Sequence, residues 1–159
     1  MSEIKIRGWG AKPRTMLRYI KSGDIFMFQV DDNRYGIGRI LIKIDFGHLA
    51  EVFDEILHST ELSEEIIRHL KRVNSPIILD SYGLFDKKLE GDWRIVAQQD
   101  GFQMPKSDNA YFCYGATNSW KKIDVFGNEE SITENEANKL PKYSPKGDRD
   151  VKEMLRIAF

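Results

Sequence analysis

The stretch that decides the fold is DIFMFQVDDNRYGIGRILIKIDF, residues 24–46. Residues 25–30 are almost all apolar and rich in β-formers, which is typical of a strand covered on both faces. Residues 31–34 are polar and predict a turn, after which apolar and charged side chains alternate. The apolar members of this alternation are Ile40, Ile42, Ile44 and Phe46, and the charged members are Arg39, Lys43 and Asp45. The stretch therefore predicts a β-hairpin with one dry and one wet face.

Two glycines in this hairpin, Gly36 and Gly38, form a Gly-x-Gly pattern. They lie within a predicted strand and do not open a helix, so the pattern does not indicate a nucleotide-binding loop. A glycine inside a strand is typical of a bulge or of a close approach by another group. We predict one of these structural roles for both glycines.

Residues 49–57 fit two secondary structures. Their apolar positions, Leu49, Val52, Phe53, Ile56 and Leu57, have helical spacing, whereas residues 46–48 indicate a turn into a third strand. We favour a strand over residues 49–54.

A mid-chain helix is predicted next, with Ser59, Thr60 or Ser63 as its N-cap. Charge supports this helix, because acidic residues fall in its first turn and basic ones near its end. These charged residues are Glu64 and Glu65, then Arg68, His69, Lys71 and Arg72. The sequence NSP at residues 74–76 is predicted to stop the helix.

The rest of the chain predicts further strands and one more helix. Strands are expected at residues 77–79, 93–96, 110–114 and 120–126. Asp148 is the expected cap of a short final helix whose apolar stripe is Val151, Met154, Leu155 and Phe159. At the other end, Trp9 is expected to pack against the edge of the core.

These elements predict an α+β fold with a strongly curved, mainly antiparallel sheet, one mid-chain helix and a short C-terminal helix. The length of 159 residues suits one domain. Within it we expect a basic irregular arm at residues 1–22, a sheet-rich core at 23–128 and a polar tail with the terminal helix at 129–159.

Composition and charge restrict the class of protein. With 41% hydrophobic and 31% charged residues the chain is globular, and no apolar stretch approaches the ~20 residues of a membrane span. The first residues lack a signal-peptide core, which predicts a cytoplasmic protein. Residues 1–43 carry nine Lys/Arg against four Asp/Glu, while residues 44–70 carry one against seven. Such asymmetry either steers a partner or only solvates two faces.

The reactive residue types do not form a catalytic pattern. His48, His58 and His69 lie ten and eleven residues apart, which matches no zinc signature. The single cysteine, Cys113, lies in a predicted strand and is expected in the core. Asp80, Ser81 and one histidine could form a hydrolase, but no spacing selects them. We therefore predict no catalytic, cofactor-binding or metal-binding residues.

Several segments together resemble the bacterial immunity protein 26 family. They are KSGDIF at residues 21–26, YGIGRI at 35–40, EVF at 51–53, DSYGLF at 80–85, WRIV at 93–96 and LPKYSP at 140–145. The resemblance touches most of the chain, and none of these segments is a catalytic signature. It implies a bacterial protein encoded beside a polymorphic toxin, which neutralises that toxin in the cytoplasm by forming a tight heterodimer with its C-terminal domain. A nuclease is one activity that such a toxin could have.

The residues also leave two other functions open. One is a single-stranded nucleic-acid-binding module that uses the basic N-terminal segment with Trp9, Tyr19 and Tyr35. The other is the hydrolase described above. For toxin binding, exposure and chemistry select two groups of candidate contacts. They are Asp31, Asp32, Arg34 and Tyr35 in the hairpin turn, and Glu129, Glu130, Glu134 and Glu136 in the late acidic stretch.

Overall fold

A computed structural model describes residues 3–10, 20–85 and 92–158 of the chain. The strands are β1 (Ile4–Ile6), β2 (Asp24–Asp31), β3 (Arg34–Ile44), β4 (Gly47–Phe53), β5 (Arg72–Leu79), β6 (Trp93–Gln99), β7 (Tyr111–Ala116), β8 (Ser119–Asp124) and β9 (Glu129–Ile132). The helices are α1 (Glu64–Arg68), α2 (Ser81–Leu84), α3 (Glu134–Ala137) and α4 (Asp148–Ala158), with a 3₁₀ turn at Lys106–Asp108. None of the helices in these residues is long and apolar enough to cross a membrane.

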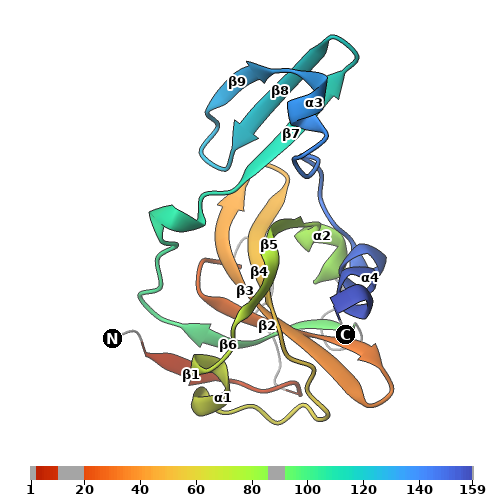
Figure 1. The fold of residues 1–159 in the computed structure, drawn as a ribbon. Coiled ribbons are helices and arrows are strands. Elements are labelled where there is room, and N and C mark those ends of the chain that lie inside the picture. The colour runs from red at the N-terminus through yellow and green to blue at the C-terminus, as the bar shows by residue number, and fades with distance from the viewer. Residues whose placement is uncertain (1–2, 11–19, 86–91, 159) are drawn as a thin grey trace.

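The strands form two antiparallel sheets (Figure 1). Six strands in the order β1-β6-β2-β3-β4-β5 make the larger sheet, and β7-β8-β9 make the smaller one. The mainly antiparallel α+β fold is thus confirmed, although the strands divide between two sheets instead of forming one. Strong curvature and the single domain remain predictions.

The predicted hairpin is confirmed as β2 and β3, with residues 32–33 at its turn. The strand over residues 49–54 is confirmed as β4, whose seven residues are all buried. A strand covered on both faces has apolar side chains at nearly every position, so its spacing does not exclude a helix. Pairing on both sides, of Leu49 with Ile42 and Ile78, is what makes this segment a strand.

The expected dry and wet faces of β3 are wrong because of a bulge at Leu41. Ile40 pairs with Ala50 and Ile42 pairs with Leu49, so Leu41 is an extra residue that shifts the alternation. Ile40 and Leu41 are both fully buried and belong to different clusters of the core. Both faces of the larger sheet are therefore covered.

Gly36 and Gly38 of β3 lie where side chains of β2 approach the backbone closely, which is one of the two roles predicted for them. A Cβ atom on Gly36 would lie 2.2 Å from the ring of Phe28. On Gly38 it would lie 2.3 Å from the ring of Phe26 and 2.5 Å from the carbonyl oxygen of Glu51. Only glycine leaves room for the two rings to lie against the neighbouring strand.

α1 lies within the stretch predicted for a mid-chain helix but ends at Arg68, and its cap is Ser63, whose hydroxyl accepts the N–H of Ile66 at 3.2 Å. The expectation of a single helix before the terminal one is wrong, because α2 and α3 are also present. The predicted stop at residues 74–76 is wrong, because these residues lie inside β5. Ala50 of β4 pairs with Ile77 and Val52 pairs with Val73, so residues 74–76 of β5 form a bulge opposite residue 51. Asn74 adopts a φ of 59°, a conformation that asparagine tolerates and that permits such a bulge.

The predicted boundaries of the arm and the tail need correction. Residues 4–6 of the arm form β1 on the edge of the larger sheet, and residues 129–132 of the tail form β9 against β8. Asp124 organises the turn between β8 and β9 by accepting the N–H groups of Phe126 and Asn128, both at 2.9 Å. Residues 11–19 lie outside the described residues.

The final helix begins at Asp148 and is not capped by it. The carboxylate of Asp150 accepts the N–H of Gly147 at 3.1 Å, while Asp148 accepts the indole N–H of Trp93 at 2.7 Å. Val151 and Leu155 are buried as predicted, Met154 packs beside them, and Phe159 lies outside the described residues. The helix is thereby attached to the larger sheet by apolar packing and one hydrogen bond.

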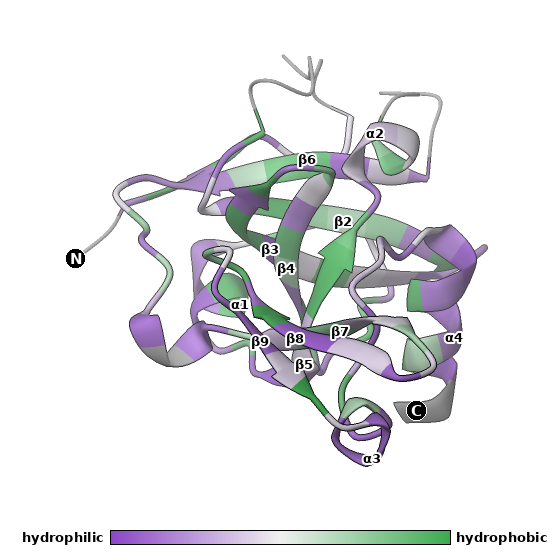
Figure 2. Cartoon of the chain, turned by 90° about the horizontal axis from the view of Figure 1, so that it is seen from above, coloured by the Kyte–Doolittle hydropathy of each residue, from purple (hydrophilic) through white to green (hydrophobic). Residues whose placement is uncertain are grey.

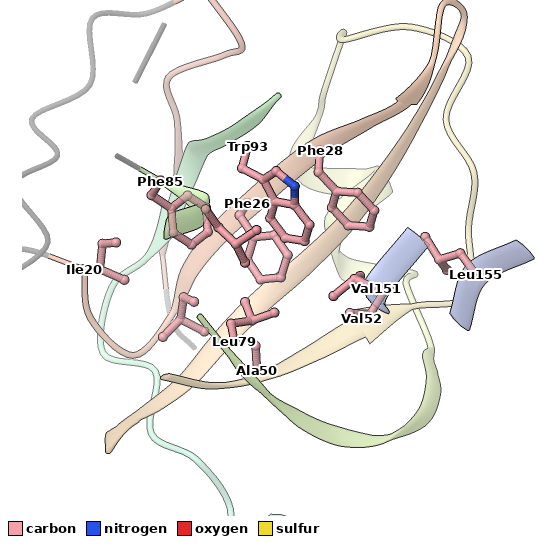
Figure 3. Close-up of a cluster of buried hydrophobic side chains, with 12 residues drawn as sticks. Ile20, Phe26, Phe28, Ala50, Val52, Leu79, Phe85, Trp93, Val151 and Leu155 are labelled. Carbon is pink, nitrogen blue, oxygen red and sulfur yellow. The ribbon is translucent and has the colours of Figure 1, made fainter. Parts of the chain in front are cut away.

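Alternate residues of β2 enter two core clusters on opposite faces of the larger sheet. On one face Phe26 and Phe28 meet Trp93 and the apolar side of α4, and the Phe28 and Trp93 rings stack at 4.3 Å (Figure 3). On the other face Ile25 and Met27 pack among residues of α1 and β6. Figure 2 shows this concentration of hydrophobic residues along β2.

A third cluster joins the two sheets. Leu41 and Leu49 of the larger sheet pack with Phe112 and Ile123 of the smaller one. The smaller sheet projects from the rest of the molecule (Figure 1).

We expect Gly38→Ala to lower the free energy of unfolding by about 1–3 kcal/mol, the usual cost of overpacking a core. The new methyl group would force the Phe26 ring or β4 to move. Urea denaturation would measure the change. Gly10→Ala is the matched control, because a Cβ atom there meets nothing within 4 Å. Equal stability of the two variants would contradict the close approach.

Candidate functional site

The hairpin turn presents less free charge than its sequence indicates. Arg34 donates from Nε to the carboxylate of Asp31 at 2.6 Å, and the N–H of Asn33 donates to the same carboxylate at 3.2 Å. The hydrogen bond from Arg34 is the main cause that lowers the pKa of Asp31. Because Asp31 and Arg34 neutralise each other, Asp32 is the candidate in this turn whose charge is left for a partner.

Tyr35 and Trp9 belong to the edge of the core. Their rings meet edge to face at 5.3 Å, and the guanidinium of Arg94 lies 4.1 Å from the Trp9 ring. The backbone of Tyr35 also exchanges two hydrogen bonds with Leu57, of 2.8 and 2.9 Å. The packing role predicted for Trp9 is confirmed. These contacts engage two of the three aromatics of the nucleic-acid hypothesis, and the third, Tyr19, lies outside the described residues.

Three of the four late glutamates are engaged in structural contacts. Glu129 accepts the hydroxyl of Tyr114 at 2.6 Å, a bond that raises the pKa of this tyrosine. Glu130 pairs with Lys122 at 3.6 Å, and Glu136 closes a capping box at the start of α3. Glu134 is the one of the four without a side-chain partner among the described residues.

The structure does not bring the two predicted groups of contacts together. The turn between β2 and β3 lies at one end of the molecule, and β9 and α3 lie at the other (Figure 1). A single small contact surface therefore cannot include both groups.

The structure does bring His48 and Ser81 together. His48 lies in β4 and is buried, so the turn predicted to include it is wrong at this residue. In the sheet, His48 pairs with Lys43 of β3 and Leu79 of β5. Its Nδ1 atom lies 2.6 Å from the hydroxyl of Ser81. Burial lowers the pKa of His48, and the positive charge of Lys43 adds to this effect.

The His48–Ser81 pair is built as a structural contact. Ser81 has no exposed surface, and the carboxylate of Asp80 accepts the N–H of Gly83 in α2 instead of contacting the histidine. A substrate cannot reach a fully buried hydroxyl. The pair instead attaches α2 to β4.

The remaining reactive groups also have structural contacts. Cys113 is buried, as predicted, and its thiol donates to the carbonyl of Ala137 at 3.3 Å. His69 is the C-cap of α1, and its Nδ1 lies 2.7 Å from the carbonyl oxygen of Glu65. In the described part of the chain, no three His, Cys, Asp or Glu residues are grouped in a way that could hold a metal ion.

A cavity of about 330 Å³ lies on the face of the larger sheet that α1 covers. We call it the α1 cavity; its lining residues are Ile4, Arg39, Phe53, Ile67, Arg68, Leu70 and Gln99. They come from β1, β3, β4, β6 and the segment around α1. Sequence reasoning missed this site because no local pattern shows that these five segments meet.

A network of ion pairs runs beside the α1 cavity. Arg39 donates from Nε and Nη2 to Glu51 at 3.0 and 2.8 Å, and from Nη1 to Gln99 at 2.7 Å. Arg72 contacts the other oxygen of Glu51 at 3.3 Å and Asp108 at 2.8 Å. Burial disfavours the charge of Arg72, but the contacts with Asp108 and Glu51 prevail and raise its pKa.

This network is balanced in charge, with two arginines and two carboxylates. Glu51 is only 5% exposed, so it needs both arginines to offset the cost of its burial. The guanidinium of Arg39 also lies 4.5 Å from the centre of the Phe102 ring. The network therefore holds the wall of the cavity in place without leaving an unpaired charge there.

Comparison with known proteins identifies the family. The family model Immunity protein 26 matches residues 21–124. The chain belongs to the immunity protein 26 family. In this family member the match runs from just before β2 to the end of β8 and includes every residue lining the α1 cavity except Ile4. No curated protein and no solved structure matches the chain.

We expect the stability of this immunity protein 26 family member to fall as the pH drops below about 6.5, the ordinary pKa of histidine. Burial lowers the pKa of His48 in the folded state, so the unfolded chain binds more protons in the interval between the two pKa values. The loss is up to about 1.4 kcal/mol per pH unit for one proton.

His48→Gln should remove this part of the pH dependence, although it lowers stability at neutral pH. Denaturation at about pH 7.5 and about pH 5.5 would measure both effects. The exposed His58 provides the control, since His58→Gln leaves the buried pair intact. A pH dependence that survives His48→Gln would contradict the assignment.

Proposed function

We propose that this protein binds a cognate toxin domain and neutralises it by covering its active surface, without catalysing a reaction. The observation that carries this proposal is the match to the Immunity protein 26 model over residues 21–124. The buried positions of Ser81, His48 and Cys113 support a role that needs no chemistry.

The proposed partner is the C-terminal domain of a toxin, bound as a heterodimer in the bacterial cytoplasm. A nuclease is one class of toxin that suits the exposed carboxylates, because a surface that binds phosphates is basic. Opposite charges on two surfaces accelerate their association and select the correct partner. The reaction of the toxin follows from the partner and not from this chain.

The two predicted groups of contact residues remain proposals, and the geometry ranks their members. Asp32 and Glu134 carry charges without a partner among the described residues. Asp31 and Arg34 are paired with each other, and Tyr35 packs against Trp9. Charge reversal at Asp32 or Glu134 is therefore the more informative change at each end.

Co-expression with the toxic domain encoded by the neighbouring gene tests the proposal. We expect the wild-type protein to restore growth and to co-purify with that domain in a 1:1 complex. Size-exclusion chromatography with light scattering would measure the stoichiometry. Continued killing by a toxin that co-purifies with no immunity protein would exclude this function.

Ser81→Ala separates occlusion from catalysis in the same assay. The variant removes the hydroxyl that His48 contacts and retains the surface of the protein. We expect full protection at equal expression. Loss of protection by a variant that is folded and still binds the toxin would point to a chemical role for the pair.

A further inference from the structure

The α1 cavity combines apolar walls, paired charges and a position on the surface of the larger sheet. We infer that it is the anchoring pocket for the toxin domain, and that it takes one large apolar side chain from a basic surface of that domain. This inference rests on the proposed function and adds the place and the chemistry of the contact.

The size and lining of the cavity suit a single side chain. Its volume of about 330 Å³ is at the lower end of the range for ligand pockets, about 300–1,000 Å³. Ile4, Phe53, Ile67 and Leu70 supply apolar walls. Anchors of this kind, buried in a well-packed pocket, carry most of the affinity of protein interfaces.

The charges that line the cavity are already paired. Arg39 is held by Glu51, and Arg68 is held by Glu64 at 2.6 Å. A carboxylate entering the cavity would have to compete with these acceptors and would itself lose hydration. With these charges paired, the part of the lining left for an occupant is its apolar half, so we expect an aliphatic or aromatic side chain whose edge meets Arg39, Arg68 and Gln99.

Exposed apolar side chains surround the cavity. Ile6 is 40% exposed and lies two residues from the lining residue Ile4, on the same face of β1. Ile66 is 37% exposed and adjoins the lining residue Ile67 in α1. Because α1 lies beside β1 (Figure 1), one partner surface can cover both side chains.

The surface on the α1 side of the cavity is acidic, whereas β1 carries Lys5, which pairs with Asp100, and Arg7, which donates to Gln98. The exposed carboxylates of Asp54, Glu55, Glu61 and Glu65 have no ion pair with any described residue. Asp54 directly follows the lining residue Phe53, and Glu65 lies in α1. Residues 54–71 contain one arginine and one lysine. Arg68 pairs with Glu64, whereas Lys71 has no ion pair with a described residue. Charge complementarity therefore selects a basic partner surface.

The opposite end of the molecule is a weaker candidate for the main contact. There, Glu129, Glu130 and Glu136 are occupied by Tyr114, Lys122 and the cap of α3. The hairpin turn, in contrast, adjoins the acidic segment through the two backbone hydrogen bonds between Tyr35 and Leu57. Asp32 therefore extends the acidic surface at the same end as the cavity.

Filling the cavity from within tests the anchor. We expect Leu70→Trp to weaken binding of the purified toxin domain at least about 30-fold, as loss of an interface hot spot does. Ile132→Trp adds the same bulk to a half-buried position of β9 at the opposite end, and its affinity should stay within about threefold of the wild type. Calorimetry would measure both affinities, and thermal unfolding would check both folds.

Charge reversal tests the basic partner and leaves the cavity unchanged. Glu55→Lys with Glu61→Lys should slow association at least about tenfold at low salt, with a smaller effect at high salt. Asp45→Lys with Glu153→Lys is the matched control, because both carboxylates are exposed and belong to neither group of candidate contacts; it should change the rate by less than about twofold. This pair of variants decides the question if Leu70→Trp does not fold.

The outcomes separate this inference from the proposed function. A wild-type protein that neither binds nor protects removes the proposed function. If the wild type binds the toxin domain, Leu70→Trp binds it with the same affinity and the Glu55/Glu61 reversal associates with it at the same rate, the role of the cavity is excluded. The proposed function then still stands. Equal losses in both tryptophan variants also exclude the role of the cavity. A homodimer of the chain alone that Leu70→Trp dissociates would assign the cavity to a second copy and exclude the toxin as its occupant.

Discussion

The packing of the Phe26 and Phe28 rings over the glycines of β3 is the constraint on which the rest of the structure depends. The rings occupy the positions where Cβ atoms of residues 36 and 38 would stand. Because they lie flat against the strand, Trp93 stacks on Phe28, and Val151 and Leu155 of α4 complete this layer (Figure 3). These side chains thereby cover this face of the larger sheet.

The other face of the same sheet is covered less completely. The short helix α1 leaves the α1 cavity beside it, and the pairing of Arg39 with Glu51 and of Arg72 with Asp108 stabilises the adjoining surface. Each charge in this network has an opposite partner, which offsets the cost of removing it from water. The result is a site with partly apolar walls and paired charges, with exposed carboxylates on its α1 side. These properties support the binding role proposed above.

The groups that chemistry would use serve the fold instead. His48 and Ser81 attach α2 to the sheet, and Cys113 donates a hydrogen bond beneath α3. An immunity protein that acts by occlusion needs a rigid surface more than a reactive one, because preorganisation reduces the entropy lost on binding. Membership of the immunity protein 26 family and the burial of these groups support the same conclusion.

Local sequence signals determined the hairpin and the core position of Cys113, and they limited the cap of α1 to Ser59, Thr60 or Ser63, since each depends on neighbours in the chain. They favoured a strand for β4 without excluding a helix, and pairing on both sides decided between the two. The segments resembling the immunity protein 26 family also determined the family. Only the tertiary structure decided the rest. The NSP segment became a bulge because β4 pairs around it, and β9 formed although its sequence, EESI, is polar. The structure also separated the two predicted groups of contacts and assembled the α1 cavity from five segments. A sequence pattern reports which face of an element is apolar, whereas a site depends on contacts between residues far apart in the chain, which strand order and bulges decide.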